Sequence, residues 1–282
     1  MRRNGLKTRL KEHLKQAGAY DARIADPHRG FEHAEEGRHP LDLWPACRSV
    51  VVFAVAMSSR AELTYVGPYS PSADSTTMRF KSSFDYALER LAHLFVATIA
   101  SWGTAFLQEN GWNVALSVSG LPGLLSEAKT QSKLCAYESG LGVYGRSGLI
   151  LHPELGNRMS IGVLLTDAVL EPDPRLVNFD PCRGCALCVR MCPARAFDAT
   201  KTYPHSWSRE KCASKTAEIL ATGLKCNNCF LVCPAGKLRD EQLLSMEQKI
   251  SFYQTARKRS FEIDEKEDNY EGQLLSLPIR GI

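Results

Sequence analysis

The most informative stretch of this 282-residue chain is CRGCALCVRMCP, residues 182–193. A second run, CNNCFLVCP, spans residues 226–234, and a single cysteine stands between the two runs. Thiolates are soft ligands, and four of them hold a [4Fe–4S] cluster. The proline after the last cysteine of each run ends the short helix that carries that cysteine. The pattern therefore predicts two [4Fe–4S] clusters, with the ligands Cys182, Cys185, Cys188, Cys192, Cys212, Cys226, Cys229 and Cys233.

The ligands are assigned to the two clusters by the rule for two-cluster ferredoxins, in which the fourth cysteine of a run binds the other cluster. By that rule the first cluster takes Cys182, Cys185, Cys188 and Cys233. The second cluster takes Cys192, Cys212, Cys226 and Cys229. Zinc and disulfides are the alternatives, but zinc sites usually show paired C-x-x-C motifs with four ligands in total. They rarely show two runs that each end in Cys-Pro.

The composition, with 44% hydrophobic and 23% charged residues, is ordinary for a globular protein. Iron–sulfur ligands must be reduced thiolates, so the ten cysteines predict a reducing compartment, which we expect to be the cytoplasm. No apolar run approaches the roughly 20 residues that span a bilayer, so no membrane insertion is expected. The charged residues after Arg2 and Arg3 exclude the apolar region of a signal peptide. Two clusters of about −2 each offset the formal charge of +4, so the loaded protein is expected to be near neutral.

Hydrophobic periodicity predicts a mixed α/β region before the cysteine runs. Leucines at helical spacing predict a helix over residues 6–17, and a valine-rich apolar run predicts a buried strand over 49–57. Residues 19–48 are expected to be irregular. The expected elements that follow are a loop over 58–76, a helix over 78–108, a strand over 112–118, a helix over 124–139, a glycine-dense loop over 140–148 and a hairpin of strands 149–152 and 159–166.

We therefore expect three parts. These are an α/β domain over residues 1–172, a ferredoxin-like module with two [4Fe–4S] clusters over 173–236, and a helical C-terminal extension and tail over 237–282. A free ferredoxin needs only the middle part. The large first part therefore indicates a second site to which the clusters deliver electrons, with a docking scaffold as the alternative.

Near the join of the first two parts, the chain resembles the epoxyqueuosine reductase family. These are cobalamin-dependent iron–sulfur enzymes akin in their core to reductive dehalogenases. The resemblance rests on SGLGVYGRSGLIL at 139–151, IGVLLTD at 161–167 and the eight-cysteine pattern with its isolated Cys212, and more faintly on FDY at 84–86. It implies an α+β fold in which a nitroreductase-like, cobalamin-binding domain precedes the ferredoxin-like module.

The resemblance also implies an electron route. An external donor of the ferredoxin or flavodoxin type would reduce the clusters, which pass electrons to a cobalamin between the domains and then to a substrate. Glycines let a backbone approach a bulky ligand closely. The residues expected to line the corrinoid are Gly142, Gly145, Arg146, Ser147, Gly148 and His152. The alternatives are that the segment only ends a helix and turns into a hairpin, or that the second cofactor is a flavin.

The chain departs from the family at two points. The family's catalytic aspartate falls on Ser126, so the candidate proton donors become Glu127 and Tyr144, with Tyr137 as a third. A carboxyl group in an apolar pocket can have a raised pKa and act as an acid near neutral pH. Ordinary structural roles are the alternative for each of these side chains. Full-length family members also carry a helical-repeat region that helps to bind tRNA, and only residues 237–282 follow the cysteines here. A small-molecule or nucleoside substrate is therefore expected, and a tRNA substrate is doubtful.

The leading prediction is an oxidoreductase, a corrinoid-dependent iron–sulfur reductase. The alternative is an electron-transfer protein, or a reductive activator of a partner's cofactor, that turns over no substrate of its own. The two cysteines outside the pattern, Cys47 and Cys135, are expected to be buried core residues.

Overall fold

The computed structural model describes residues 3–56, 94–117, 131–198, 200–201, 206–221, 226 and 228–236. The first elements along the chain are α1 (Arg3–Gln16), β1 (Asp21–Ala25), α2 (Pro40–Leu43) and β2 (Ser49–Ala56), followed by a helical stretch over 94–109. The later elements are β3 (Val114–Ser117), α5 (Ser132–Glu138), β4 (Val143–Tyr144), β5 (Ile150–Leu151), β6 (Met159–Thr166), α6 (Leu187–Arg190), α7 (Arg209–Ala221) and α8 (Asn228–Leu231).

Several expectations fall on other parts of the chain. The loop over 58–76, the start of the long helix, residues 118–130 with Ser126 and Glu127, and the extension over 237–282 lie outside the described residues. The stretch over 94–109 agrees with the second half of the predicted long helix. No helix within the described ranges combines the length and the apolar character that a membrane crossing requires.

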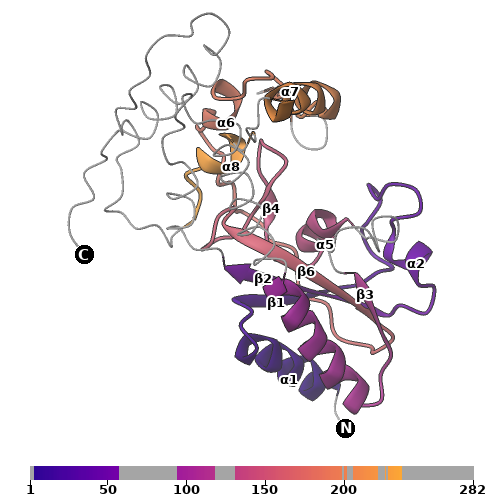
Figure 1. Ribbon diagram of the computed structural model, residues 1–282. Helices are drawn as coiled ribbons and strands as arrows, with labels where there is room; N and C mark the ends of the chain where they lie inside the picture. Colours follow the sequence, from indigo (N-terminus) through magenta and orange to yellow (C-terminus); the bar gives the residue numbers. More distant parts are fainter. Residues whose placement is uncertain are drawn as a thin grey trace, which may run out of the picture.

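A four-stranded antiparallel sheet in the order β1-β2-β6-β3 forms the centre of the α/β part (Figure 1). Successive side chains on a strand point to opposite faces, so each central strand contributes to two cores. Val51 and Phe53 of β2 belong to a core that includes Leu10 of α1 and Leu107 of the 94–109 helix. The residues that alternate with them, Val50, Val52 and Ala54, face a second core that includes Leu134 of α5. Helices therefore cover both faces of the sheet.

Burial on both faces explains the composition of β2. All its residues from Ser49 to Val55 are buried, which is why the run is apolar without alternation. Such runs are typical of parallel sheets, whose two faces are both covered. Here both neighbours of β2 are antiparallel to it, with Val51 opposite Ile24 of β1 and opposite Leu164 of β6. The predicted buried strand over 49–57 is confirmed. Its pattern indicates the burial of the strand and not its direction.

The first helix is also confirmed, although it begins three residues before the predicted start. Leu10 and Leu14 have no exposed surface, which accounts for their helical spacing. Gly18 follows the helix with a φ of 112°, a conformation that side chains disfavour. Glycine at this position therefore ends α1 and directs the chain towards β1.

Two sequence predictions are wrong. Residues 19–48 are not irregular throughout, because they contain the edge strand β1 and the short helix α2. The hairpin of strands 149–152 and 159–166 does not form: β5 pairs with β4, whereas β6 pairs with β2 and β3. The physical reason is that β6 is apolar enough to lie at the centre of the sheet. The short β5 instead pairs with β4, which lies inside the glycine-dense segment.

The segment after β6 is fastened to the α/β part before it reaches the cysteines. Asp173 accepts bonds from the ammonium groups of Lys7 and Lys11, at 2.8 and 2.7 Å, and from the backbone N–H of Ile24. Arg175 forms an ion pair with the buried Glu138 at the end of α5. The segment between β6 and the first cysteine run is thus part of the packed structure, and it brings residue 182 close to the glycine-dense segment.

Gly162 offers a test of this packing. It lies on β6 opposite Phe53, and a Cβ at this position would overlap the Phe53 ring. We expect Gly162→Ala to destabilise the fold by roughly 1–3 kcal/mol, as overpacking does. The control is Gly5→Ala on α1, where a Cβ would meet nothing within 4 Å. That change should be neutral or stabilise by up to about 1 kcal/mol. Urea denaturation monitored by tryptophan fluorescence measures both, and equal effects would contradict this account of the sheet.

Candidate metal centre

The cysteine runs fold into short helices with turns between them. Cys188 lies on α6 and Cys229 on α8. The sequence predicts that each short helix also carries the last cysteine of its run, but Cys192 and Cys233 lie just beyond the helix ends, next to their prolines. The two helices share a small core of Leu187, Met191 and Val232. This core is too small to hold the segment in shape without help. The thiols and the groups that they bind must therefore contribute to its stability.

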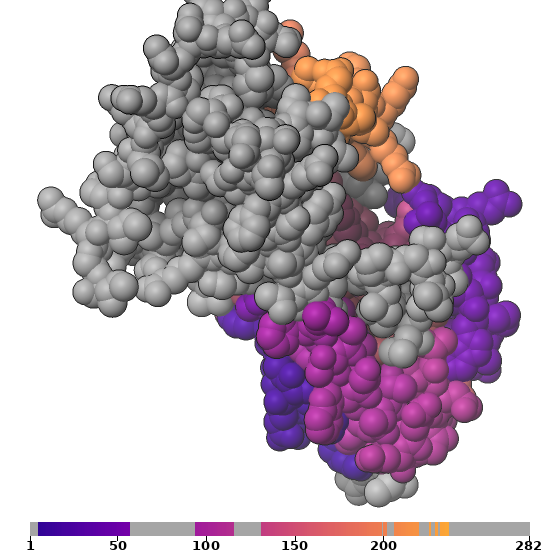
Figure 2. Space-filling model, viewed as in Figure 1, coloured from indigo at the N-terminus to yellow at the C-terminus, as the bar shows by residue number. Residues whose placement is uncertain are grey.

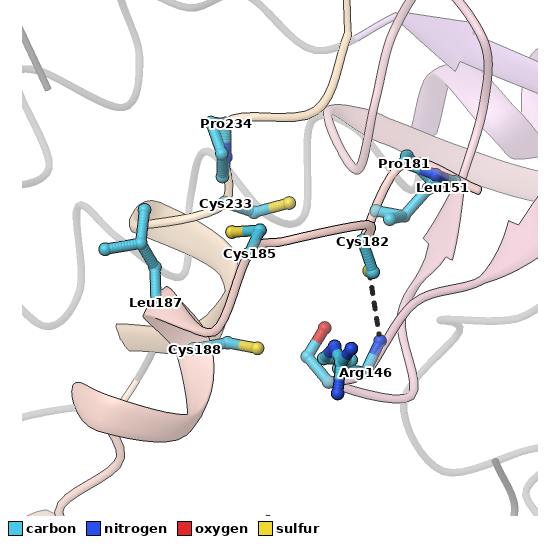
Figure 3. A pocket seen from close by; sticks show the side chains of 10 residues that line it. Arg146, Leu151, Pro181, Cys182, Cys185, Leu187, Cys188, Cys233 and Pro234 are labelled. Atoms are coloured by element: carbon cyan, nitrogen blue, oxygen red, sulfur yellow. Dashed lines mark hydrogen bonds between the residues drawn. The ribbon is translucent and has the colours of Figure 1, made fainter. Parts of the chain in front are cut away.

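The structure brings four of the eight cysteines to one pocket. Cys182, Cys185 and Cys188 come from the first run, and Cys233 comes from the end of the second run (Figure 3). This is the set that the ferredoxin rule assigns to the first cluster. Arg146 and Ser147 of the glycine-dense segment line the same pocket.

The other four cysteines form a second group. The thiol of Cys229 interacts electrostatically with those of Cys226, Cys212 and Cys192, in that order of strength. Cys212 reaches this group from the long helix α7, which begins at Arg209. The isolated cysteine of the sequence therefore joins the three that the same rule assigns to the second cluster.

Burial and mutual repulsion act on these thiols together. Burial, followed by the neighbouring cysteines, raises the pKa of Cys188 and of Cys229 to about 12. A group of thiolates can therefore be held here only beside a strong positive charge. The iron atoms of a [4Fe–4S] core supply that charge and favour sulfur ligands, so the donor set fits the cluster.

No group of three or more His, Cys, Asp or Glu side chains in the described ranges forms a site for a single metal ion. A four-iron cube is wider than one ion and binds a thiolate at each of four corners. The pocket between Cys182, Cys185, Cys188 and Cys233 suits that wider group.

The glycine-dense segment contacts the first cysteine group through its backbone. The N–H of Arg146 donates to the Sγ of Cys182 at 3.4 Å, as the dashed line in Figure 3 shows. The turn is closed by two bonds, from Gly145 N–H to Leu149 O at 2.8 Å and from Gly148 N–H to Gly145 O at 2.9 Å. Hydrogen bonds to ligand sulfur influence the reduction potential of a cluster. A cluster bound by Cys182 would therefore be influenced directly by this segment.

The glycines of this segment have a local structural reason. A Cβ at Gly142 would lie 2.8 Å from the carbonyl oxygen of Leu151, and one at Gly145 would lie 2.8 Å from the Leu151 side chain. Both positions are thus filled by β5. Gly148 has a φ of 67°, which the tight turn requires. Of the six residues expected to line a corrinoid, only Arg146 and Ser147 line the cysteine pocket.

His152 takes part in a polar network away from that pocket. Its Nδ1 accepts the backbone N–H groups of Glu154 and Leu155, and its Nε2 lies 3.6 Å from the carboxylate of Asp21. Both ring nitrogens are therefore occupied. This arrangement gives His152 a structural role, and its predicted place beside a corrinoid stays a prediction.

The proton-donor candidates lie in different places. The ring of Tyr144, on β4, is 5.4 Å from that of Tyr137, and the guanidinium of Arg175 lies 5.4 Å from the Tyr137 ring. Tyr144 is half-buried, next to the glycine turn. Glu127 lies outside the described residues, so its role stays a prediction.

Sequence reasoning missed three polar residues, and two of them, Asn157 and Arg158, connect the two parts of the molecule. Asn157 donates to the carbonyl of Phe230 at 2.7 Å, and Arg158 donates to that of Cys233 at 3.5 Å. Lys133 of α5 donates to the carbonyl of Gly148 at 3.1 Å. The sequence signal for Asn157 and Arg158 is a pair of polar residues directly before the largely apolar strand β6.

Comparisons with known proteins agree with this geometry. No family model matches the chain. The epoxyqueuosine reductase of Staphylococcus aureus is 25% identical over 227 residues, which cover 74% of this chain and 54% of that enzyme. A tetrachloroethene reductive dehalogenase of Desulfitobacterium hafniense is 33% identical over 122 residues, which cover 36% of this chain and 22% of that protein.

A solved structure of the Bacillus subtilis epoxyqueuosine reductase shares the fold. It has a TM-score of 0.56 at 19% identity and covers 86% of this chain and 68% of that one. The chain resembles epoxyqueuosine reductase. The resemblance inferred from the sequence is thereby confirmed, and the fold is the mixed α/β fold of epoxyqueuosine reductase. The match spans about half the length of the Staphylococcus aureus enzyme.

The crossed grouping of cysteines predicts the outcome of double substitutions. The wild-type chain should hold about eight irons, that is, two [4Fe–4S] clusters. The pair Cys188→Ala and Cys233→Ala removes two ligands of one cluster and should leave about four irons. The pair Cys188→Ala and Cys229→Ala should abolish both clusters.

Iron and sulfide analysis after anaerobic purification measures these contents. Cys135→Ala is the control, because this buried cysteine of α5 belongs to neither group. It should retain the wild-type iron content. Loss of both clusters from the Cys188 and Cys233 pair would contradict the crossed grouping.

The Asp21 network predicts a pH dependence. Burial by itself would raise the pKa of Asp21, but hydrogen bonds to His152 and Arg23 hold that pKa well below its usual range. The folded protein therefore binds fewer protons here than the unfolded chain, and stability from this group is complete above about pH 4 and lost in more acid solution. Asp21→Asn should lower the free energy of unfolding by roughly 1–3 kcal/mol. Denaturation should show the same loss of unfolding free energy for Asp21→Asn at pH 7 and at pH 5. A loss that vanishes at pH 5 would contradict the assignment.

Proposed function

We propose that the chain is a corrinoid-dependent iron–sulfur reductase. In this proposal electrons enter through two [4Fe–4S] clusters and leave through a cobalamin held beside the glycine-dense segment. The observation that carries the proposal is the contact between this segment and the first cysteine group, where the Arg146 N–H meets the Cys182 sulfur. A cofactor that touches the segment would lie next to the first cluster, as electron transfer requires.

The proposal divides the chain as the sequence suggests. A nitroreductase-like α/β domain over residues 1–172 would carry the corrinoid, and a ferredoxin-like module over 173–236 would carry the clusters. The two are joined by residues from both sides. Asn157 and Arg158 reach the second cysteine run, and Asp173 fastens the connecting segment to α1. Figure 2 shows the orange surface of the cysteine-bearing part standing next to the violet and magenta α/β part.

The described residues narrow the corrinoid contacts. Gly142 and Gly145 pack against β5, and His152 faces Asp21. Arg146 and Ser147 are half-buried, whereas Gly148 is buried in the turn. We propose that Arg146 and Ser147 hold the cofactor and that Gly148 sets the turn that positions them. When bound, the cobalamin would supply a strongly reducing cobalt centre, and the chain's own residues would position it and exclude water.

We propose Tyr144 as the proton donor among the described residues, because it adjoins the glycine turn and its ring is held by Tyr137. Its phenol O–H can donate a proton, as can the carboxyl of Glu127 that the sequence also suggests. Tyr144→Phe and Glu127→Gln assayed side by side would distinguish the two donors.

The proposed substrate is a small molecule or a modified nucleoside. A related epoxyqueuosine reductase has been solved with an epoxyqueuosine-modified tRNA stem loop, so a nucleoside carried on tRNA is the natural comparison. Assays with the free nucleoside and with the stem loop would separate the two. If the chain turns over only the stem loop, the proposed substrate becomes the nucleoside carried on tRNA and not the free nucleoside. The external electron donor would be a ferredoxin or a flavodoxin.

The test of the proposal is retention of cobalamin. The chain is reconstituted anaerobically with cobalamin and repurified, and iron, cobalt and flavin are counted per chain. We expect both iron–sulfur absorption and bound cobalt. Iron–sulfur absorption without retained cobalt would overturn the corrinoid proposal, and bound flavin would identify the other cofactor that the sequence allows.

Gly148→Ala provides the matched variant. The control is Gly37→Ala, because Gly37 has a φ of 71°, close to the 67° of Gly148, and lies in a loop before α2. Both changes strain the backbone by about the same amount, roughly 1 kcal/mol. Only Gly148→Ala should reduce retained cobalt. If both variants lose the same amount of retained cobalt, the stability of the fold, and not the glycine-dense segment, controls cobalamin binding.

One observation favours an electron-transfer protein as the second candidate. Because β5 already fills the space next to Gly142 and Gly145, these glycines have a structural reason without any cofactor. In that case the chain would carry two clusters, bind no corrinoid and reduce the cofactor of a partner protein. Reduction of such a partner by the dithionite-reduced chain, with no bound cobalt, would support this candidate.

A further inference from the structure

The turn from His152 to Arg158 is fixed in front of the central strand β6. His152 and Gly156 exchange two backbone bonds, from the N–H of each to the carbonyl of the other, at 2.8 and 2.9 Å. The N–H of Arg158 donates to the carbonyl of Leu155 at 3.1 Å, and the next residue, Met159, begins β6. Because backbone bonds close the turn and a buried strand continues it, the turn has a definite position relative to the sheet.

Two buried side chains of this turn reach the second cysteine run. Asn157, which is 4% exposed, donates from its amide to the carbonyl of Phe230 at 2.7 Å. Arg158, which is 7% exposed, donates from one guanidinium nitrogen to the carbonyl of Cys233 at 3.5 Å and to the Oδ1 of Asn157 at 3.3 Å. The two side chains thus support each other and the backbone around Cys233. Because both are buried, water replaces these bonds poorly when one partner is removed.

A third contact lies just beyond Cys233. The backbones of Gly156 and Ala235 approach so closely that a Cβ on Gly156 would overlap the carbonyl of Ala235. The φ of Gly156 is 60°, which also favours glycine at this position. The turn therefore contacts the second run before Cys233, at Cys233 and after it.

Cys233 is the ligand of the first cysteine group that most needs such support. The other three ligands in the pocket belong to a single run, Cys182, Cys185 and Cys188. The glycine-dense segment holds the start of that run through the bond from Arg146 to Cys182. Cys233 reaches the pocket from the other run, so completing the site costs the entropy of ordering the chain between them. Contacts that orient a metal ligand from outside strengthen the site that it completes.

We infer that Asn157 and Arg158 are positioning residues that place the Cys233 sulfur at the first cluster. They carry the fixed geometry of β6 and its turn to the one ligand of that cluster that comes from the second run. The second cluster takes its ligands from elsewhere and does not use Cys233. The inference rests on the proposed pair of clusters and not on the identity of the second cofactor or of the substrate.

The test measures iron release from the full chain. Protein purified anaerobically with its clusters is mixed with an excess of an iron(II) chelator, and the absorbance of the iron–chelator complex is followed. Asn157→Ala removes the amide bond, and Arg158→Met removes the guanidinium bonds but keeps an unbranched apolar stem. In each variant about four of about eight irons should leave about 10–100-fold faster than in wild type, the usual cost of losing an outer partner of a metal ligand. The remaining irons should leave at the wild-type rate.

A chain without the first cluster separates positioning from a general loss of stability. The pair Cys188→Ala and Cys233→Ala should keep only the second cluster, so adding Asn157→Ala to this pair should not change the release of the remaining iron. Electron paramagnetic resonance of the dithionite-reduced proteins identifies the slowly released cluster, because its spectrum should match that of the pair. If Asn157→Ala fails to fold, Arg158→Met carries both measurements.

Gly162→Ala is the second control. It disturbs the packing of β6 against Phe53 and touches neither cysteine run. Any change that it causes in iron release should therefore be the same for both clusters.

Three outcomes would overturn the inference. These are unchanged release in both Asn157→Ala and Arg158→Met, equal acceleration for both clusters, and acceleration that persists in the chain without the first cluster. A wild-type chain that holds no pair of clusters would instead overturn the proposed function, and this inference with it. The iron content of the wild-type chain therefore distinguishes the two failures.

Discussion

Thiolates repel one another, and the cysteine-bearing part of this protein collects eight of them within a small volume. Burial and neighbouring cysteines raise the pKa of Cys188 and Cys229 to about 12, so the thiolate form is unfavourable at both positions without a positive partner. An iron–sulfur core would provide that partner. The small apolar core of Leu187, Met191 and Val232 could not hold the short helices in position by itself. The compensation of sulfur charge is therefore the constraint on which this part depends.

The α/β part meets that constraint with a rigid support. Its central strands are buried on both faces, and β6 leads directly into the fastened segment before Cys182. The turn before β6 approaches the end of the second run so closely that a Cβ at Gly156 would overlap the carbonyl of Ala235. Backbone contacts from two turns, one between β4 and β5 and one before β6, thus reach the two cysteine runs. A sheet that resists deformation can hold such contacts in a fixed geometry.

The glycine-dense segment serves several of these contacts at once. Its glycines admit β5 at Gly142 and Gly145 and permit the tight turn at Gly148, which leaves backbone groups free to meet Cys182 and Lys133. The need for close packing and a role in cofactor binding do not exclude one another. The same lack of side chains that lets β5 approach also exposes the amide groups of the turn.

Much of this could be predicted from residue spacing alone. Cys-Pro endings and the isolated Cys212 sufficed to propose eight candidate sulfur ligands, because ligand chemistry restricts both residue type and local spacing. Helical leucines and the apolar run of β2 predicted α1 and the buried strand, since burial leaves a periodic trace in the sequence. The edge strand β1 was missed, because a five-residue strand with mixed polarity carries little signal. The pairing of β5 with β4 was also missed, since two-residue strands are decided by what surrounds them.

By itself, the sequence determined the identity of the thiols, the elements with strong periodicity and the family resemblance. Tertiary structure alone decided that β5 pairs with β4, that Asn157 and Arg158 join the two parts, and that Lys133 meets the glycine turn. The physical reason is that sequence spacing records local geometry and burial, whereas contacts between residues far apart in the chain depend on how the packed layers bring their surfaces together.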